Sequence, residues 1–185
     1  QPERIGPAAL EPLVAYLCNL ALHSSLAQER IGEQFESPHH VADYVEGVPI
    51  LASILSSRPD ASSHAAVNAF IATMPEDHRL ALQADPTFHG DIPGDPATAA
   101  EEAMVELSAK ALYRWDQRVK AELARPDLSM EEMGVWLKQA KEVGDLQKGT
   151  LQRSIFNDRL VTVKKAGKPP FQRGNRSFSK PENNP

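Results

Sequence analysis

The chain has 185 residues, a formal net charge of −5 and 41% hydrophobic residues, enough apolar side chain to form a core. No stretch approaches the roughly 20 uninterrupted apolar residues that span a bilayer, and the single cysteine, Cys18, excludes an internal disulfide. The first ten residues also lack the apolar segment of a secretory signal. We therefore expect no membrane contact and an intracellular location, in the cytoplasm or within a virion or another large complex.

The first 84 residues contain several short stretches in which apolar residues recur every three or four positions, as in amphipathic helices. These stretches cover residues 12–31, 39–47, 50–55, 62–74 and 76–84. Ser25 and Gln28 have the spacing of a capping box, and Gly47 predicts a break between two helices. No sustained alternation of apolar and polar residues indicates a sheet. We predict an all-α protein with an N-terminal bundle of short helices over residues 1–84.

Residues 85–96, DPTFHGDIPGDP, contain three prolines and two glycines. This composition does not support regular structure. We predict a linker here that separates the bundle from the next part of the chain. Asp85, His89, Asp91 and Asp95 in this segment resemble an oxygen-rich metal site, but aspartates in turns usually bond their own backbone, so we assign no metal or other cofactor.

Residues 98–123 form the clearest helical pattern. Two signals mark its start, Asp95-Pro96 and the capping-box spacing of Thr98 with Glu101, and Arg125-Pro126 lies beyond its end. On a helical wheel one face is apolar. That face carries Met104, Leu107, Ala111, Leu112, Trp115, Val119 and Leu123. This long helix is the element against which we expect the rest of the chain to pack.

A second long helix follows the short link at Pro126-Asp127, and Ser129 with Glu132 forms another capping box. Its apolar stripe includes Met133, Trp136 and Leu137 and is expected to continue as far as Ile155. Tight packing against another helix would explain its two glycines, Gly134 and Gly144. A link this short predicts a long antiparallel helical hairpin over residues 97–157.

The apolar faces of this hairpin also suggest contacts between copies of the chain. We predict a homo-oligomer held together by six of these side chains, Leu107, Trp115, Val119, Met133, Trp136 and Leu137.

The C-terminal 35 residues differ sharply in charge from the rest of the chain. Residues 151–185 contain eight lysines and arginines but only two acids, a net charge of +6, which leaves −11 on residues 1–150. Residues 158–185 hold too few apolar side chains to fold alone. We predict an extended basic arm whose contacts are made by Arg159, Lys164, Lys165, Lys168, Phe171, Arg173, Arg176, Phe178 and Lys180.

Cations interleaved with exposed aromatic rings suit nucleic acid, because cations neutralise phosphates and rings stack on unpaired bases. The same arm would also suit an acidic protein surface. The layout of short helices, helical hairpin and basic tail is similar to that of phage DNA-packaging small subunits and other viral assembly proteins; that likeness carries no residue motif, so it implies no site residues.

No nucleophile elbow, phosphate-binding loop or dinucleotide fingerprint occurs in the sequence. We therefore predict a non-enzymatic oligomeric assembly or nucleic-acid-binding protein without catalytic residues. The alternative is a structural subunit or adaptor of a larger complex that uses the arm as a protein-binding strap.

Overall fold

The computed structural model describes residues 10–35, 44–148, 152–153 and 160–161 of the chain. These residues are almost entirely helical, which confirms the all-α prediction. The elements are α1 (Pro12–His23), α2 (Ser25–Gln34), α4 (Val48–Ser57), α5 (His64–Thr73), α6 (Glu76–Ala84), the 3-10 helix η1 (Pro86–His89), α7 (Pro96–Leu123), α8 (Met130–Gln147), and the two-residue strands β1 (Gln152–Arg153) and β2 (Leu160–Val161). Within the described ranges, no helix is both long and apolar enough to cross a lipid bilayer.

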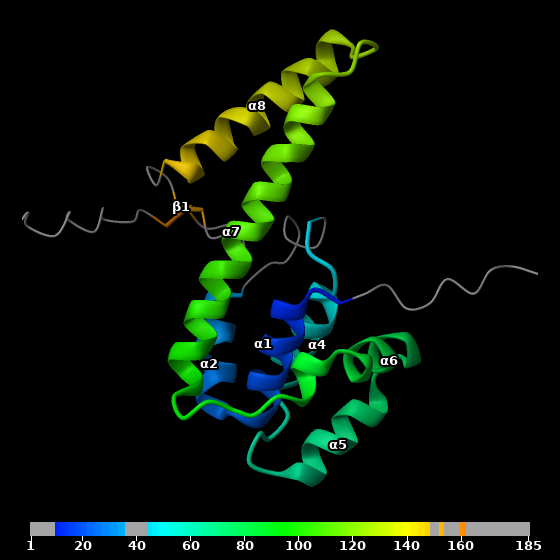
Figure 1. Ribbon diagram of the computed structural model, residues 1–185, viewed down its shortest axis with the longest axis vertical. Helices are drawn as coiled ribbons and strands as arrows, with labels where there is room; N and C mark the ends of the chain where they lie inside the picture. The colour runs from blue at the N-terminus through cyan, green and yellow to red at the C-terminus, as the bar shows by residue number, and fades with distance from the viewer. Residues whose placement is uncertain (1–9, 36–43, 149–151, 154–159, 162–185) are drawn as a thin grey trace, which may run out of the picture.

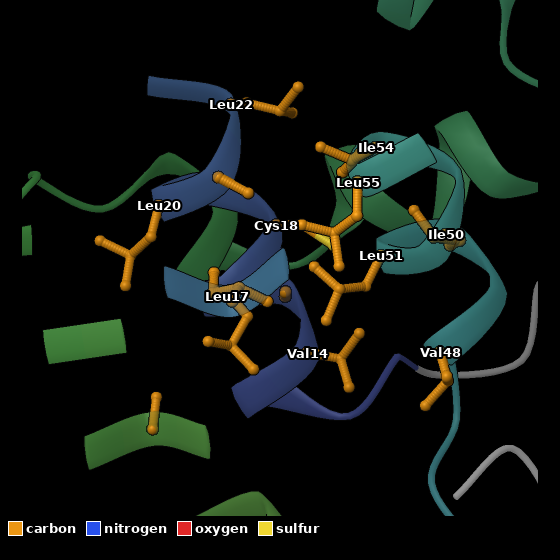
Figure 2. Packing of buried hydrophobic residues seen from close by; sticks show 14 of the residues in the cluster. Val14, Leu17, Cys18, Leu20, Leu22, Val48, Ile50, Leu51, Ile54 and Leu55 are labelled. Atoms are coloured by element: carbon orange, nitrogen blue, oxygen red, sulfur yellow. The ribbon is translucent and has the colours of Figure 1, made fainter. Parts of the chain in front are cut away.

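The main core lies where α1 and α2 pack against the first half of α7 and where α4 packs against α1 (Figure 1). Figure 2 shows the α1–α4 contact, in which Val14 and Cys18 of α1 face Leu51 and Leu55 of α4. Burial raises the pKa of the Cys18 thiol, so at neutral pH this cysteine is a neutral core residue. Helices α5 and α6 lie at the edge of the bundle, and each has one fully buried side chain, Val67 in α5 and Leu82 in α6.

The helix boundaries follow local capping chemistry. Ser24 ends α1 and caps α2, because its hydroxyl accepts a hydrogen bond from the amide of Ala27 at 3.2 Å. The predicted capping box of Ser25 with Gln28 is therefore wrong, because the capping residue is Ser24, one position earlier. Gly47 precedes α4 with a φ of 94°, a conformation that glycine adopts without strain, so the predicted break is found there. The helix predicted over residues 39–47 lies mostly outside the described residues.

The segment predicted to be an irregular linker is partly ordered as η1 and packs on the bundle. Phe88 is buried in the main core, and the Asn19 side chain of α1 donates a hydrogen bond to the carbonyl oxygen of Gly90 at 2.9 Å. The same core includes five residues of α7: Ala100, Ala103, Met104, Leu107 and Ala111. Residues 85–96 thus connect α6 to a helix that is itself part of the bundle.

Helix α7 begins at Pro96, at the first of the two predicted start signals, and runs from the bundle to the turn before α8 (Figure 1). Its cap is Asp95, whose carboxylate accepts hydrogen bonds from the amide and hydroxyl of Thr98. Thr98 is therefore inside the helix, and the capping box predicted for it is wrong. The capping box of Ser129 with Glu132 at the start of α8 is confirmed.

Helix α8 ends at Gln147, so the prediction that it continues to Ile155 is wrong. The strand β1 follows at Gln152–Arg153 and pairs antiparallel with β2, Gln152 opposite Val161 and Arg153 opposite Leu160.

The glycines of α8 are not explained by tight packing, contrary to the prediction. A Cβ atom added to Gly134 or Gly144 would meet no atom within 4 Å. We therefore expect Gly144→Ala to raise the free energy of unfolding by about 0.5–1 kcal/mol, because alanine loses less backbone entropy on folding into a helix. Urea denaturation of the variant against the parent chain measures this change, and a loss of stability would show that the site is more crowded than described.

Candidate interaction surfaces

The second half of α7 is joined to α8 by a small apolar cluster, which we call the joint. Its buried members are Trp115, Val119 and Val143, with Trp136 half-buried against them. The indole N–H of Trp115 donates a hydrogen bond to Oε1 of Gln139 at 2.9 Å, so the ring is fixed by packing and by a polar contact. Helix α7 leads up to the connecting turn and α8 leads back down from it at an angle to α7 (Figure 1).

Trp115 also reaches the bundle, because its ring stacks on that of Tyr44 with centroids 6.1 Å apart. Trp115 therefore contacts both the joint and the main core, and it is buried by residues of its own chain. The tryptophan that looked available for self-association is used inside the monomer.

The six side chains predicted to hold an oligomer together lie in different environments. Leu107 is fully buried in the main core, and Trp115 and Val119 are buried in the joint. These three contact other parts of the same chain and offer no exposed surface to a second copy. Met133 and Trp136 are half-buried, whereas Leu137 is 54% exposed. Leu137 is therefore the one member of the predicted set whose side chain is more exposed than buried.

A buried carboxylate holds the start of α1 against α7. Glu11 is only 7% exposed and forms ion pairs with two side chains of α7, Lys110 at 3.1 Å and Arg114 at 2.8 Å. Arg114 donates a second hydrogen bond, to the carbonyl oxygen of Tyr44 at 2.8 Å. Burial opposes ionisation of Glu11, but the hydrogen bonds from Arg114 and Lys110 outweigh it and lower the pKa of this carboxyl.

Sequence reasoning missed this ion cluster. Glu11 lies 99 residues from Lys110 and 103 from Arg114, so no local spacing connects them. Helical spacing connects Lys110 with Glu106, one turn away, but that ion pair is longer, at 3.9 Å, and the Glu106 side chain is 62% exposed. The one available signal is that Glu11 directly precedes the proline that opens α1.

We expect Glu11→Gln to lower the free energy of unfolding by about 1–3 kcal/mol at pH 7, because it removes the charged partner of two hydrogen-bonded cations. The pKa of Glu11 is lowered in the folded state, so its stabilisation is complete above the unfolded value near 4.5 and is lost as pH falls through the folded value. The difference in the free energy of unfolding between the parent chain and the variant should therefore become smaller in acid. Urea midpoints of both chains, measured from pH 7 to pH 3, test this pH dependence.

Glu106→Gln is the matched control, since Glu106 pairs weakly with the same Lys110 on the surface. It should change stability by less than about 0.5 kcal/mol at every pH. Equal effects of the two substitutions would show that Glu11 is not the buried member of this cluster.

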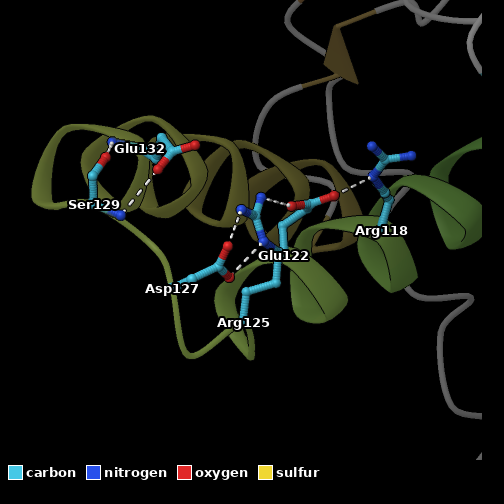
Figure 3. A network of polar contacts seen from close by, with 6 residues as sticks. All are labelled: Arg118, Glu122, Arg125, Asp127, Ser129 and Glu132. Atoms are coloured by element: carbon cyan, nitrogen blue, oxygen red, sulfur yellow. Dashed lines mark hydrogen bonds and ion pairs between the residues drawn. The ribbon is translucent and has the colours of Figure 1, made fainter.

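The turn between α7 and α8 is held by a network of charged side chains (Figure 3). Arg125 donates to Glu122 at 2.8 Å and to both oxygens of Asp127, while Arg118 donates to Glu122 at 2.9 Å. The Arg125 guanidinium holds the pKa of Glu122 and that of Asp127 below their usual values. These contacts, with the capping box of α8, fix the direction in which α8 leaves the turn.

Several large apolar side chains remain on the surface of the two long helices. Met130, Val135 and Leu137 of α8 are 83%, 53% and 54% exposed, and Val105 and Tyr113 of α7 are 70% and 62% exposed. Such positions mark contact surfaces when they cluster on one face.

The predicted basic arm, residues 158–185, lies outside the described residues except for β2. The residues assigned to its contacts, Arg159 to Lys180, lie outside the residues whose side chains the structure describes. Across the described ranges, no group of three or more His, Cys, Asp or Glu residues could hold a metal ion. His89, considered above for such a site, lies 2.9 Å through its Nε2 from the carbonyl oxygen of Gln83.

No protein-family model, no curated protein and no solved structure matches this chain.

Proposed function

We propose that this chain is a non-enzymatic oligomeric assembly or nucleic-acid-binding protein whose basic C-terminal arm contacts nucleic acid or a neighbouring subunit. The observation that carries the proposal is the division of charge, +6 on residues 151–185 against −11 on residues 1–150. An acidic body repels phosphate backbones, so any contact with nucleic acid falls to the arm.

The composition of the arm supports nucleic acid as its ligand. Its cations would displace counterions from phosphates, and Phe171 and Phe178 would stack on unpaired bases. Helix α7, with 28 residues, is about 42 Å long at 1.5 Å per residue. In this proposal the two long helices serve as the rigid frame from which the arm extends.

The test compares binding of a fluorescent single-stranded oligonucleotide by the full-length chain and by a variant in which Lys164, Lys165 and Lys168 are glutamines. Anisotropy titrations are repeated over a series of salt concentrations. The logarithm of the affinity should fall linearly with the logarithm of salt, and the variant should flatten that slope by about 2, since each lost phosphate contact accounts for about 0.7.

A control variant changes three body cations, Arg79, Lys120 and Lys148, to glutamine. It should keep the slope of the parent chain because these residues belong to the acidic part of the molecule. If the arm variant keeps both the affinity and the slope, the nucleic-acid half of the proposal fails.

The second candidate is a structural subunit or adaptor that uses the arm as a protein-binding strap. The exposed Val105 and Tyr113 on α7 favour it, because they offer apolar contacts that nucleic acid does not require. A partner complex that survives nuclease treatment but is lost in the triple-lysine variant would support this candidate over the first.

A further inference from the structure

We propose that the basic arm folds back on its own chain and covers an exposed stripe of α7, so that nucleic acid binds only by displacing it. The occupant is residues 162–185 of the same chain, the part of the arm beyond β2. The stripe is a set of five side chains in the first two thirds of α7: Glu102, Val105, Glu106, Ala109 and Tyr113. The effect of this autoinhibitory contact rests on the nucleic-acid binding proposed above.

The stripe lies on the side of α7 that faces away from the bundle. At 100° per residue its five members fall within an arc of about 100°. The centre of that arc is about 160° from the centre of the face that α7 buries in the main core. Val105 and Tyr113 are 70% and 62% exposed. The described part of the chain therefore leaves two large apolar side chains of this face uncovered.

The charge of the stripe selects a cationic occupant. Glu102 and Glu106 each lie within about 20° of Tyr113 around the helix, so ionic and apolar contacts share one face. Glu102 has no ion pair among the described residues. Glu106 reaches only Lys110, at 3.9 Å, and the same Lys110 amino group lies closer to Glu11, at 3.1 Å. A basic segment with apolar side chains is complementary to such a surface.

The end of α8 brings the chain close to the stripe. Val143 and Leu146, in the last turns of α8, belong to the same apolar cluster as Leu112 and Trp115 in the middle of α7. Leu112 lies about two turns, or about 10 Å, from Val105 along α7 and about 20° from it around the helix. The chain therefore leaves α8 beside the exposed face, far from the turn that joins the two long helices (Figure 1).

The two short strands keep the start of the arm near that point. Their pairing places Val161 opposite Gln152, which is four residues beyond Lys148. Those four residues span at most about 14 Å, and paired strands are about 5 Å apart. Lys164 then lies within about 10 Å of Val161, and Lys168 within about 25 Å. The stripe is about 17 Å long from end to end, so these lysines can reach it.

The arm has the side chains that complement the stripe. Lys164, Lys165 and Lys168 are the first cations after β2 and meet the two glutamates of the stripe, while Phe171 supplies a ring to cover Val105. The same three lysines are the phosphate contacts of the proposed function, so the stripe and nucleic acid exclude each other. Because the arm belongs to the same chain, its high effective concentration favours the contact even though each exposed ion pair is weak.

The first test locates the arm in the full-length, nuclease-treated chain. A spin label on Ala109→Cys should broaden the amide NMR signals around Lys164 and Lys168, and the broadening should persist on dilution. Cys18 is buried and does not compete for the label. The matched control is a label on Ala72→Cys, an exposed alanine of α5 away from the middle of α7 (Figure 1), which should leave these signals unchanged.

The ionic nature of the contact is tested with the same label. Glu102→Gln combined with Glu106→Gln should greatly reduce the broadening, and so should about 1 M salt, which screens exposed charges.

The second test measures regulation through the affinity for a fluorescent single-stranded oligonucleotide at about 0.15 M ionic strength. Glu102→Gln with Glu106→Gln should tighten binding about threefold to tenfold, because the arm no longer has to leave two exposed ion pairs. Glu76→Gln with Asp77→Asn is the matched control. It removes the same two charges from the first turn of α6 and should change the affinity by less than about twofold, since distant exposed charges are screened.

Arm signals that the Ala109 label leaves sharp, or that both labels broaden equally, would overturn the contact. Broadening that fades on dilution would place the arm on a neighbouring copy and overturn a contact within one chain. If the two pairs of substitutions tighten oligonucleotide binding equally, the contact does not regulate binding. A chain that binds no oligonucleotide loses the proposed function, while the spin label still decides whether the arm covers the stripe.

Discussion

Replacing Gly47 with alanine should lower the free energy of unfolding by about 2–4 kcal/mol, the sum of a backbone and a packing penalty. Gly47 has a φ of 94°, where a side chain is strained. An added Cβ would overlap Cδ1 of Leu10 and lie 3.1 Å from its Cγ and 3.4 Å from Cγ1 of Val14. Leu10 and Val14 are both buried, so they have little space in which to move.

Gly32→Ala is the matched control, because Gly32 lies inside α2 and an added Cβ meets nothing within 4 Å. It should stabilise the chain by up to about 1 kcal/mol. The two substitutions insert the same methyl group, so thermal or urea unfolding should show changes of opposite sign. Two changes of the same sign would mean that the turn before α4 is not built as described.

Leu107→Ala should destabilise the protein by about 2–5 kcal/mol, the range for truncating a fully buried leucine. Leu107 is 0% exposed and lies where α7 meets the bundle. The cavity would open between α7 and the N-terminal helices, so a single cooperative unfolding transition should shift as a whole. Urea denaturation followed by circular dichroism measures the shift.

Val105→Ala, two residues away on the same helix, is the control. Val105 is mostly exposed, so its truncation should change stability by less than about 0.5 kcal/mol. If the two truncations had equal effects, α7 would not be packed in the bundle, and residues 97 onward would form a separate unit as the sequence pattern suggested.

The local features of this fold could be predicted because local chemistry decides them. The expected helix over residues 76–84 matches α6, and α7 ends at the predicted Leu123. Ser129 and Glu132 form their capping box because all of its atoms lie within one turn of helix. Two capping residues were possible at the start of α7, Asp95 and Thr98, and their spacing to the following residues did not show that Asp95 is the cap.

The partners of each apolar face could not be predicted, because helical periodicity shows that a side chain is buried and does not show what covers it. Leu107 and Trp115 lie on one predicted face, yet the first contacts the bundle and the second the joint. Leu137 was grouped with them but is exposed. The Glu11 cluster likewise depends on contacts between residues about 100 positions apart.

Helix α7 therefore belongs to two cores of very different size. The protection of its backbone amides against hydrogen exchange should differ between its two halves for this reason. The joint has three buried side chains, whereas the main core includes buried residues of six α-helices and η1. Opening of α8 alone would expose little apolar surface, so its backbone amides should exchange with solvent hydrogen through local openings that leave the bundle folded. Amides near Leu107 would exchange only on global unfolding, and the boundary between the two regimes would fall at Trp115.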